Sequence, residues 1–489
     1  MTNHMKHVRA SEQGKQKQPQ KGLVVAFAPF AGYALYRSWL AITQYERLLF
    51  AEPAQNAISM MGIHISTSLA FALACVIIWA VWRSRDERMC DAPLVYWGAA
   101  AAFTIGTAVS AVAGSGEIAG ELARAGRICG GALTGIGSAF AFVMWGELFS
   151  TLSQKWVRTF SLMQLAVPIP FLFLVFAPYV ARFAVFVSLP ALAFAALWAA
   201  HKSPLKEVRA ATCAKRTNRI KPNAQVVAGV AIICAGYGFL QTLLTMNNVR
   251  PVLLAQMVLA AFVLAFAIAY AVFGRTDDPD YRRAMRTVTS ILVMGYLLFP
   301  LVSNDAVRFI GNTLIISGFI LFEYIIIVAL SDAASHAEQP PAVIFAAARA
   351  IVTGSLVAGM LVSVALWCAV PDFQSSNTAR SIIVAVSVML MSTAGIWLLS
   401  ENNLHRFFWG GGSGTGGKEQ LGEAVAKIAR THNLTNRERD VLELWIQGRS
   451  VPYIQENLVI GKNTVSTHVR HIYQKCGVHS RQELLDLVQ

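Results

Sequence analysis

Long apolar runs dominate the first four hundred residues of the chain, and polar residues are concentrated in the segments between them. A helix of about 20 mostly apolar residues is long enough to cross a bilayer. The pattern therefore predicts twelve membrane-spanning helices in two sets of six, although a short ninth run and a tight joint between the fifth and sixth leave eleven or thirteen open. The runs lie at roughly 22–43, 58–82, 93–113, 128–150, 159–179, 183–200, 224–244, 251–273, 287–303, 309–331, 342–368 and 379–400.

The composition indicates a polytopic membrane protein of the all-α class. Hydrophobic residues make up 55% of the 489 residues, and charged residues only 14%. A soluble globular chain carries about 25% charged residues, which argues against one large soluble enzyme and against disorder. The seven cysteines form no C-x-x-C pair and adjoin no histidine cluster, so we expect neither a metal site nor a cofactor.

The distribution of lysine and arginine predicts the orientation in the membrane. If the N-terminus is cytoplasmic, the inner segments before residue 287 hold 21 Lys and Arg, whereas the outer loops hold 7. Lys and Arg resist translocation, so we expect a multi-pass protein of the bacterial cell membrane with both termini in the cytoplasm. Residues 1–21 form a basic tail, and the run after them is too long for a cleaved signal and contains Arg37.

Two sets of six runs separated by a long basic loop, 201–223, suggest a duplicated bundle. The loops after the second and eighth runs occupy equivalent places, and both carry Asp and Arg: Arg83-Ser-Arg-Asp86-Glu-Arg88 and Gly274-Arg275-Thr-Asp277-Asp278. This organisation resembles the major facilitator superfamily of transporters over residues 22–400. The resemblance implies a 6+6 helix bundle, but transport activity does not follow from a fold.

A few ionisable side chains lie inside the predicted spans, where each costs about 2.5–3.5 kcal/mol on insertion scales. They are Arg37, Glu147, Glu323 and Arg349. In a facilitator-like bundle, spans 1, 4, 7 and 10 line a central cavity. That arrangement makes Arg37, Glu147, Gln241 and Glu323 candidates for a ligand or proton site. The alternative is a structural ion pair or hydrogen bond that holds the helices together.

The composition changes after the last apolar run. Residues 401–420 are rich in glycine, which predicts a flexible linker. Gly412 to Lys418 has the spacing of a phosphate-binding loop, but Glu419 stands where Ser or Thr must meet magnesium, and no strand precedes it. We therefore expect no nucleotide binding there.

Residues 421–489 read as a small domain of four helices. Thr435 and Glu438 form a capping box that begins the first helix, and Ser450 caps a short second one. The third helix is expected at 462–476, and a second capping box at 480–483 begins the fourth. Two helices joined by a tight turn form a helix-turn-helix, whose second helix enters the major groove of DNA.

The outer face of the third helix carries hydrogen-bond donors and cations and no carboxylate. It comprises Lys462, Asn463, Ser466, Thr467, Arg470, His471 and Gln474. Such a face suits contact with phosphates and base edges. An ordinary solvated helix face is the alternative interpretation of this pattern alone.

A series of motifs makes the domain more specific. They are Leu434-Thr435-x-Arg437-Glu438-Arg439-x-Val441-Leu442, Gly448-x-Ser450, Ile454, Leu458, Thr464-Val465-x-x-His468, Ile472-Tyr473-x-Lys475 and Ser480-Arg481. They closely resemble the LuxR-type helix-turn-helix over residues 430–489. The resemblance implies that the third helix reads double-stranded DNA and that the fourth pairs two copies into a homodimer. It implies DNA contacts at Thr464, Ser466, Thr467, Arg470 and Lys475, with His468 and His471 nearby.

These observations predict a membrane-anchored, one-component transcription regulator. The twelve-span domain would sense a small molecule, and the tethered domain would bind a promoter in response. A secondary transporter with a fused regulatory DNA-binding domain is the main alternative, and a membrane anchor without a ligand is a weaker one. The sequence holds no hydrolytic triad, so we do not expect an enzyme.

Overall fold

The computed structural model divides the chain into two compact units, residues 1–410 and 411–489. Its described residues are almost entirely helical, as the sequence predicts, and contain no β-strand. They are residues 30, 32–44, 57–85, 87–115, 118, 120–202, 224–246, 251–273, 281–298, 305–369, 385–386, 388–395, 425–446, 451–478 and 484.

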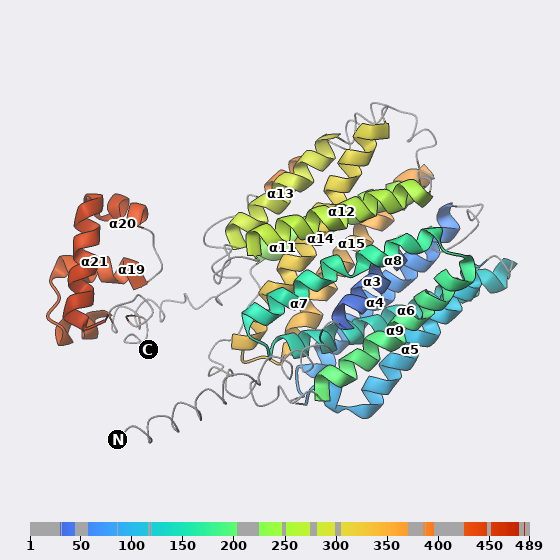
Figure 1. The fold of residues 1–489 in the computed structure, drawn as a ribbon, viewed down its shortest axis with the longest axis horizontal. Helices are drawn as coiled ribbons and strands as arrows, with labels where there is room; N and C mark the ends of the chain where they lie inside the picture. The colour runs from blue at the N-terminus through green and yellow to red at the C-terminus, as the bar shows by residue number, and fades with distance from the viewer. Residues whose placement is uncertain are drawn as a thin grey trace, which may run out of the picture. The chain divides into compact units, whose positions relative to one another are not determined.

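The helices of the first unit follow the predicted apolar runs (Figure 1). They are α3 (Gly32–Gln44), α4 (Ala57–Trp82), α5 (Pro93–Gly114), α6 (Gly120–Phe149), α7 (Gln154–Ala166), α8 (Pro168–Leu172), α9 (Tyr179–Lys202), α11 (Ala224–Met246), α12 (Pro251–Phe273), α13 (Tyr281–Leu298), α14 (Asp305–His336) and α15 (Pro341–Ala369). Within the twelfth run, residues 388–395 are helical. Eight of the described helices are long and apolar enough to cross a membrane. The count of twelve spans therefore stays a prediction.

The fifth run is not the single helix that its hydrophobicity predicts at 159–179. It begins earlier, with α7 at Gln154, and continues as the short α8 and the 3-10 turn η4 (Phe173–Phe176). Pro168 is the first residue of α8. Proline has no N–H to donate and its ring clashes with the preceding turn, which favours an interruption of the helix at this point. Apolar character alone does not reveal that interruption.

The helices pack in two repeated sets. In the first set α5 and α4 pack on α6, and α3 packs on α7; in the second set α13 and α12 pack on α14, and α11 packs on α15. The packed pairs of the second set thus correspond to those of the first, with α11 to α15 matching α3 to α7 in chain order. The sets meet where α4 packs on α15 and α7 on α12, which is itself a symmetric pair of contacts (Figure 1). The described helices thus form two sets with repeated packing, as a 6+6 bundle requires, and the number of spans stays a prediction.

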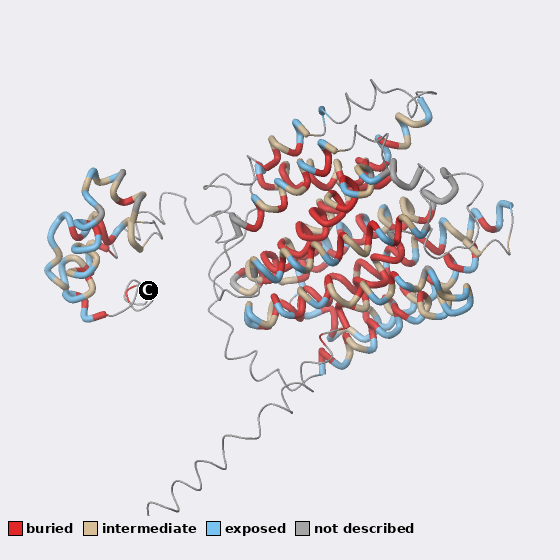
Figure 2. The backbone as a smooth tube through the Cα atoms, turned by 45° about the horizontal axis from the view of Figure 1, so that its top comes forward, coloured by how far each residue is buried: buried red, intermediate tan, exposed pale blue. Residues whose placement is uncertain are grey.

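Burial separates an interior from an apolar outer surface (Figure 2). The most deeply enclosed helix is α14, with 94% of its most apolar stretch buried. Large apolar side chains such as Leu73, Ile77 and Leu94 are instead exposed on the outside of the unit. A soluble surface rarely exposes so much continuous apolar area, so lipid is the solvent that this surface requires.

The second unit has its own hydrophobic core. Its described helices are residues 425–431, α19 (Asn436–Ile446), α20 (Val451–Leu458) and α21 (Lys462–Cys476). The predicted stripe of α21 is buried at Val465, Ile472 and Cys476, and Val469 is half-buried. The helix at 425–431 was not predicted, and the predicted fourth helix lies outside the described residues except for Leu484.

The backbones of α11 and α15 approach each other closely at Gly359, and a substitution there tests this packing. A Cβ atom at Gly359 would collide with the carbonyl oxygen of Ala235, whereas a Cβ atom at Gly354, also on α15, would meet nothing. We expect Gly359→Ala to lower the free energy of unfolding by about 1–3 kcal/mol, because backbone would have to move.

Gly354→Ala is the matched control for this prediction. It should leave stability unchanged or raise it by up to about 1 kcal/mol, because alanine favours a helix over glycine. Thermal unfolding of the full chain in detergent measures both variants. Equal midpoints for the two variants would contradict the packing described for α11 and α15.

Candidate functional sites

In the C-terminal unit, the predicted capping box at the start of α19 is formed. The backbone N–H of Thr435 donates to Glu438 Oε2 at 2.8 Å, and the N–H of Glu438 donates to Thr435 Oγ1 at 3.3 Å. These two bonds satisfy donors that the first turn of a helix leaves open. The side chain of Glu438 is only 4% exposed, so its carboxylate is buried within the unit.

Lys475 connects this cap to the end of α21. Its Nζ donates to Glu438 Oε2 at 2.7 Å and to the carbonyl oxygen of Asn433 at 3.3 Å. Its own carbonyl lies 3.1 Å from Nδ1 of His432. Burial alone would raise the pKa of Glu438, but the hydrogen bonds from Lys475 and Thr435 hold it below its ordinary value. The ammonium that the sequence assigns to DNA is thus engaged in holding α19 and α21 together.

The remaining predicted DNA contacts lie on the outer side of α21. Asn463, Thr464, Ser466, Thr467 and Arg470 are exposed, and His468 and His471 are half-buried. Lys462 begins the helix, and its side chain lies outside the described residues. Among the residues that the structure describes, Arg470 forms no ion pair.

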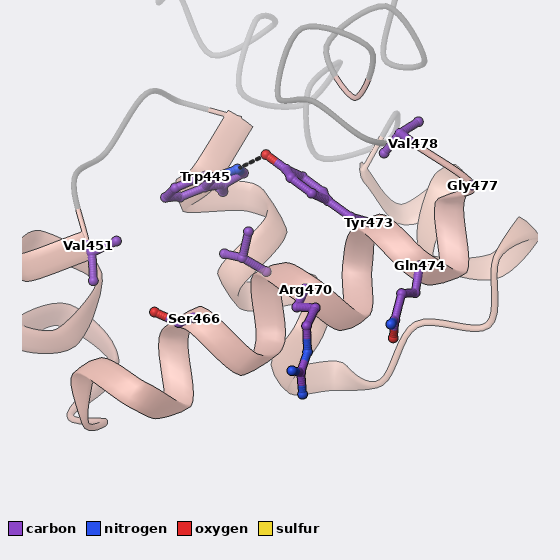
Figure 3. Close-up of a pocket in the computed structure, with 9 residues that line it drawn as sticks. Trp445, Val451, Ser466, Arg470, Tyr473, Gln474, Gly477 and Val478 are labelled. Carbon is purple, nitrogen blue, oxygen red and sulfur yellow. Dashed lines mark hydrogen bonds between the residues drawn. The ribbon is translucent and has the colours of Figure 1, made fainter.

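An open groove of about 640 Å³ runs beside this face (Figure 3). Arg470 and Gln474 project from α21 in the same direction, away from Trp445 and Tyr473. Trp445 Nε1 donates to the Tyr473 hydroxyl at 3.1 Å, which joins α19 to α21. All four side chains line the groove, and Arg470 and Gln474 are exposed to solvent.

In the membrane unit, the structure gathers three of the charged residues in one cluster. Arg37 Nη2 lies 2.5 Å from Glu323 Oε2, and Arg349 Nη1 lies 2.6 Å from Glu323 Oε1. The exposed fractions of the Arg37, Glu323 and Arg349 side chains are 8%, 5% and 12%. The cluster joins α3 of the first set to α14 and α15 of the second.

Aromatic rings surround the cluster. The Arg349 guanidinium lies over the rings of Phe71 at 5.7 Å and Phe142 at 5.1 Å, a cation–π arrangement. Tyr33, one turn before Arg37 on α3, and Tyr36, directly before it, are both buried. Arg349 was not among the predicted ligand residues. Its charge inside an apolar run was visible in the sequence, but the direction in which α15 presents it was not.

The other two predicted ligand residues lie apart from this ion cluster. Glu147 on α6 accepts hydrogen bonds from the backbone N–H of Met89, at 3.1 Å for Oε2 and 3.3 Å for Oε1. It therefore fixes the 3-10 turn η3 (Met89–Asp91) ahead of α5. Gln241 on α11 is buried, and its side chain interacts with His64 on α4.

The two units are similar to different known proteins. Residues 432–488 match the family model of bacterial regulatory proteins of the luxR family. The HTH-type transcriptional regulators MalT of Serratia proteamaculans (strain 568) and of Yersinia pestis are each 42% identical over 65 residues. This match covers 13% of the chain and only 7% of each regulator's length. The LuxR-type resemblance of the C-terminal domain is confirmed.

The membrane unit is similar to solved transporter structures. The human organic anion transporter MFSD10 (TETRAN) superposes with a TM-score of 0.54 at 14% identity, covering 78% of this chain and all of that one. The major facilitator proton:xylose symporter XylE gives 0.52 at 12% identity, covering 78% and 95%. At such low identity these matches confirm the major-facilitator-like fold and carry no substrate over to this chain.

The link between Glu438 and Lys475 generates a prediction about stability. In a fragment of residues 411–489, Glu438→Gln should lower the free energy of unfolding by about 1–3 kcal/mol, because Lys475 loses its charged acceptor and the bonds of Thr435 lose their charge assistance. Trp445 is the one tryptophan of that segment, so its fluorescence reports urea unfolding. Glu443→Gln, an exposed change on the same helix, is the control.

The same link predicts a dependence on pH. A carboxyl group with a lowered pKa in the folded state adds stability above its ordinary pKa of about 4.3. That stability is lost as the pH falls through the lowered value. The fragment with Glu438 should therefore lose stability more steeply than Glu438→Gln as the pH falls from about 6 to about 3. Parallel pH curves for the two would contradict the assigned ion pair.

Proposed function

We propose that the chain is a membrane-anchored, one-component transcription regulator. The observation that carries this proposal is α21: a 15-residue helix without a carboxylate, whose outer side offers Arg470 and several polar side chains to solvent. Its buried stripe holds it rigidly on the core of a domain of the luxR family. A rigid, cationic helix is what insertion into the major groove requires.

The proposed DNA contacts divide by chemistry. Arg470 donates to guanine edges or phosphates, whereas Asn463, Thr464, Ser466 and Thr467 offer shorter polar groups near the start of α21. Lys475 stays a predicted contact, with two of the three N–H donors of its ammonium bonded to Glu438 and Asn433. We propose that Lys475 also acts on DNA binding indirectly, by fixing the angle between α19 and α21.

We propose that the membrane unit senses a small molecule and that the response passes through local concentration and pairing of the DNA-binding units. The glycine-rich composition of 401–420 favours this route, since a glycine-rich chain of about 14 residues spans roughly 20 Å on average and does not transmit a rotation. Two copies on DNA are expected for a domain of this kind, whose operators carry two half-sites. Both termini are proposed to lie in the cytoplasm of a bacterium. The proposal assigns no catalytic step to either unit.

A secondary transporter with a fused DNA-binding domain is the second candidate. The repeated packing of two six-helix sets favours it, because alternating access in such folds rocks one set against the other. The purified full chain in liposomes can be offered labelled sugars, organic acids and amines. Concentrative uptake that Glu323→Gln abolishes would support transport, and no uptake across the panel would contradict it.

Substitution of Arg470 tests the regulator proposal. If Arg470 reads a base, Arg470→Ala should weaken specific promoter binding by about 1–3 kcal/mol. Genome-wide occupancy of the full chain identifies the promoters, and a binding assay on one of them gives the change in affinity. Arg430→Ala, which removes the same charge from an exposed position before α19, is the control and should change binding far less. Equal occupancy by wild type and Arg470→Ala would overturn the assignment of α21.

A further inference from the structure

The cluster of Arg37, Glu323 and Arg349 carries an excess positive charge. Each oxygen of the one carboxylate is taken by a different guanidinium group, so Glu323 has no further oxygen to offer. Arginine stays protonated in proteins, and two guanidinium groups against one carboxylate leave a net charge of about +1. Within the described residues, neither arginine has a second acidic partner.

Hydrogen-bond donors remain open in the same place. Nε of Arg37, Nε of Arg349 and the Tyr36 hydroxyl are buried and form no hydrogen bond among the described residues. Tyr36 is 1% exposed, so water does not solvate its hydroxyl from outside. Open donors in a protein interior are uncommon and costly. Three of them beside an uncompensated positive charge call for an acceptor that bears a negative charge.

The surroundings define what else the acceptor must carry. The rings of Phe71 and Phe142 face the Arg349 guanidinium, and Tyr36 stacks on Trp39 with 6.5 Å between ring centroids. These neighbouring side chains are apolar and aromatic, and they would not solvate a small, strongly hydrated inorganic anion. They suit an organic molecule with one anionic end and an aromatic or apolar body.

We propose that Arg37, Arg349 and Tyr36 form the recognition site for a small organic carboxylate. The ligand's carboxylate neutralises the excess charge and accepts from the open donors, which Glu323 alone leaves unused. Because Arg37 belongs to the first six-helix set and Arg349 to the second, the bound anion touches both sets. This inference rests on the proposed sensing function of the membrane unit and names the class of molecule that is sensed.

A purely structural role for the cluster is the competing explanation. In that case Glu323 is sufficient for the two arginines, and its removal destabilises the protein without creating any affinity. If the site binds carboxylates, Glu323 competes with the ligand for the same guanidinium groups. Removal of Glu323 then weakens the free protein but strengthens its response to an added carboxylate. The two explanations predict opposite responses of one variant.

The experiment uses the purified full chain in nanodiscs with benzoate as the probe and benzamide as its uncharged isostere. Titration calorimetry and thermal unfolding should show that benzoate binds and stabilises the wild type, whereas benzamide does not. Arg37→Gln and Arg349→Gln should each weaken benzoate binding about tenfold or more, since each removes a charge-assisted bond. Tyr36→Phe should weaken it severalfold. Arg127→Gln, whose guanidinium instead donates to the carbonyl of Ala113, is the control and should bind like the wild type.

Glu323→Gln decides between the explanations even where an arginine variant fails to fold. It should unfold at a lower temperature than the wild type without ligand and show a larger stabilisation by benzoate. Octanoate and acetate are titrated beside benzoate. The proposal is overturned if none of the three binds either the wild type or Glu323→Gln, or if benzamide binds as tightly as benzoate. It is also overturned if Glu323→Gln is destabilised and gains no response.

Promoter binding by the same preparations separates this inference from the proposed function. If benzoate binds but does not change promoter occupancy, the carboxylate site is supported and the sensing function of the membrane unit is contradicted. Intact promoter binding with no carboxylate binding removes the site and leaves the DNA-binding unit as it is.

Discussion

The carboxylate of Glu323, shared by two arginines, is the interaction on which the arrangement of the membrane unit depends. The lipid interior provides no partner for a charge or an open backbone group, so the chain must form helices and must match each charge within the bundle. Glu323 pairs with both arginines and reaches across the two six-helix sets, to Arg37 on α3 and to Arg349 on α15. It stands on α14, the most enclosed of the long helices. The polar link therefore coincides with the seam where the sets meet.

Most of the membrane fold could be predicted from the sequence because hydrophobic length is a local property. The bounds of α4, α5, α12 and α15 agree with the predicted runs to within a residue or two. The breaks in the fifth run depended on Pro168, which an average over apolar residues does not register. The partnership of Arg349 depends on the rotation of one helix against others. That rotation is set by packing, including the close approach at Gly359, and no pattern within a single helix encodes it.

The C-terminal unit was predictable for a different reason. The residues of a capping box have a fixed spacing in the sequence, and the bonds between Thr435 and Glu438 form as that spacing predicts. The ion pair of Lys475 could not be predicted in this way. The LuxR-type resemblance implies a DNA contact at Lys475, which stays a prediction, whereas the structure pairs it with Glu438, 37 residues earlier in the chain and 2.7 Å away in space. An ion pair between distant segments does not follow from the residues of one helix face.

Three buried carboxylates, Glu147, Glu438 and Glu323, differ in the number of donors and cations that each one faces. Glu147 accepts from a backbone N–H, and Glu438 is matched by the ammonium of Lys475 and by its cap. Among the described residues, neither of these carboxylates is shared by two arginines. Glu323 differs because two cations compete for its two oxygens while Nε of both arginines stays open. A hydrogen-bond network whose donors and acceptors are all paired rigidifies a fold. A network with unpaired donors and excess charge is stabilised by a ligand that pairs with them. That surplus makes the Glu323 cluster the place where a small anion would change the energy of the membrane unit.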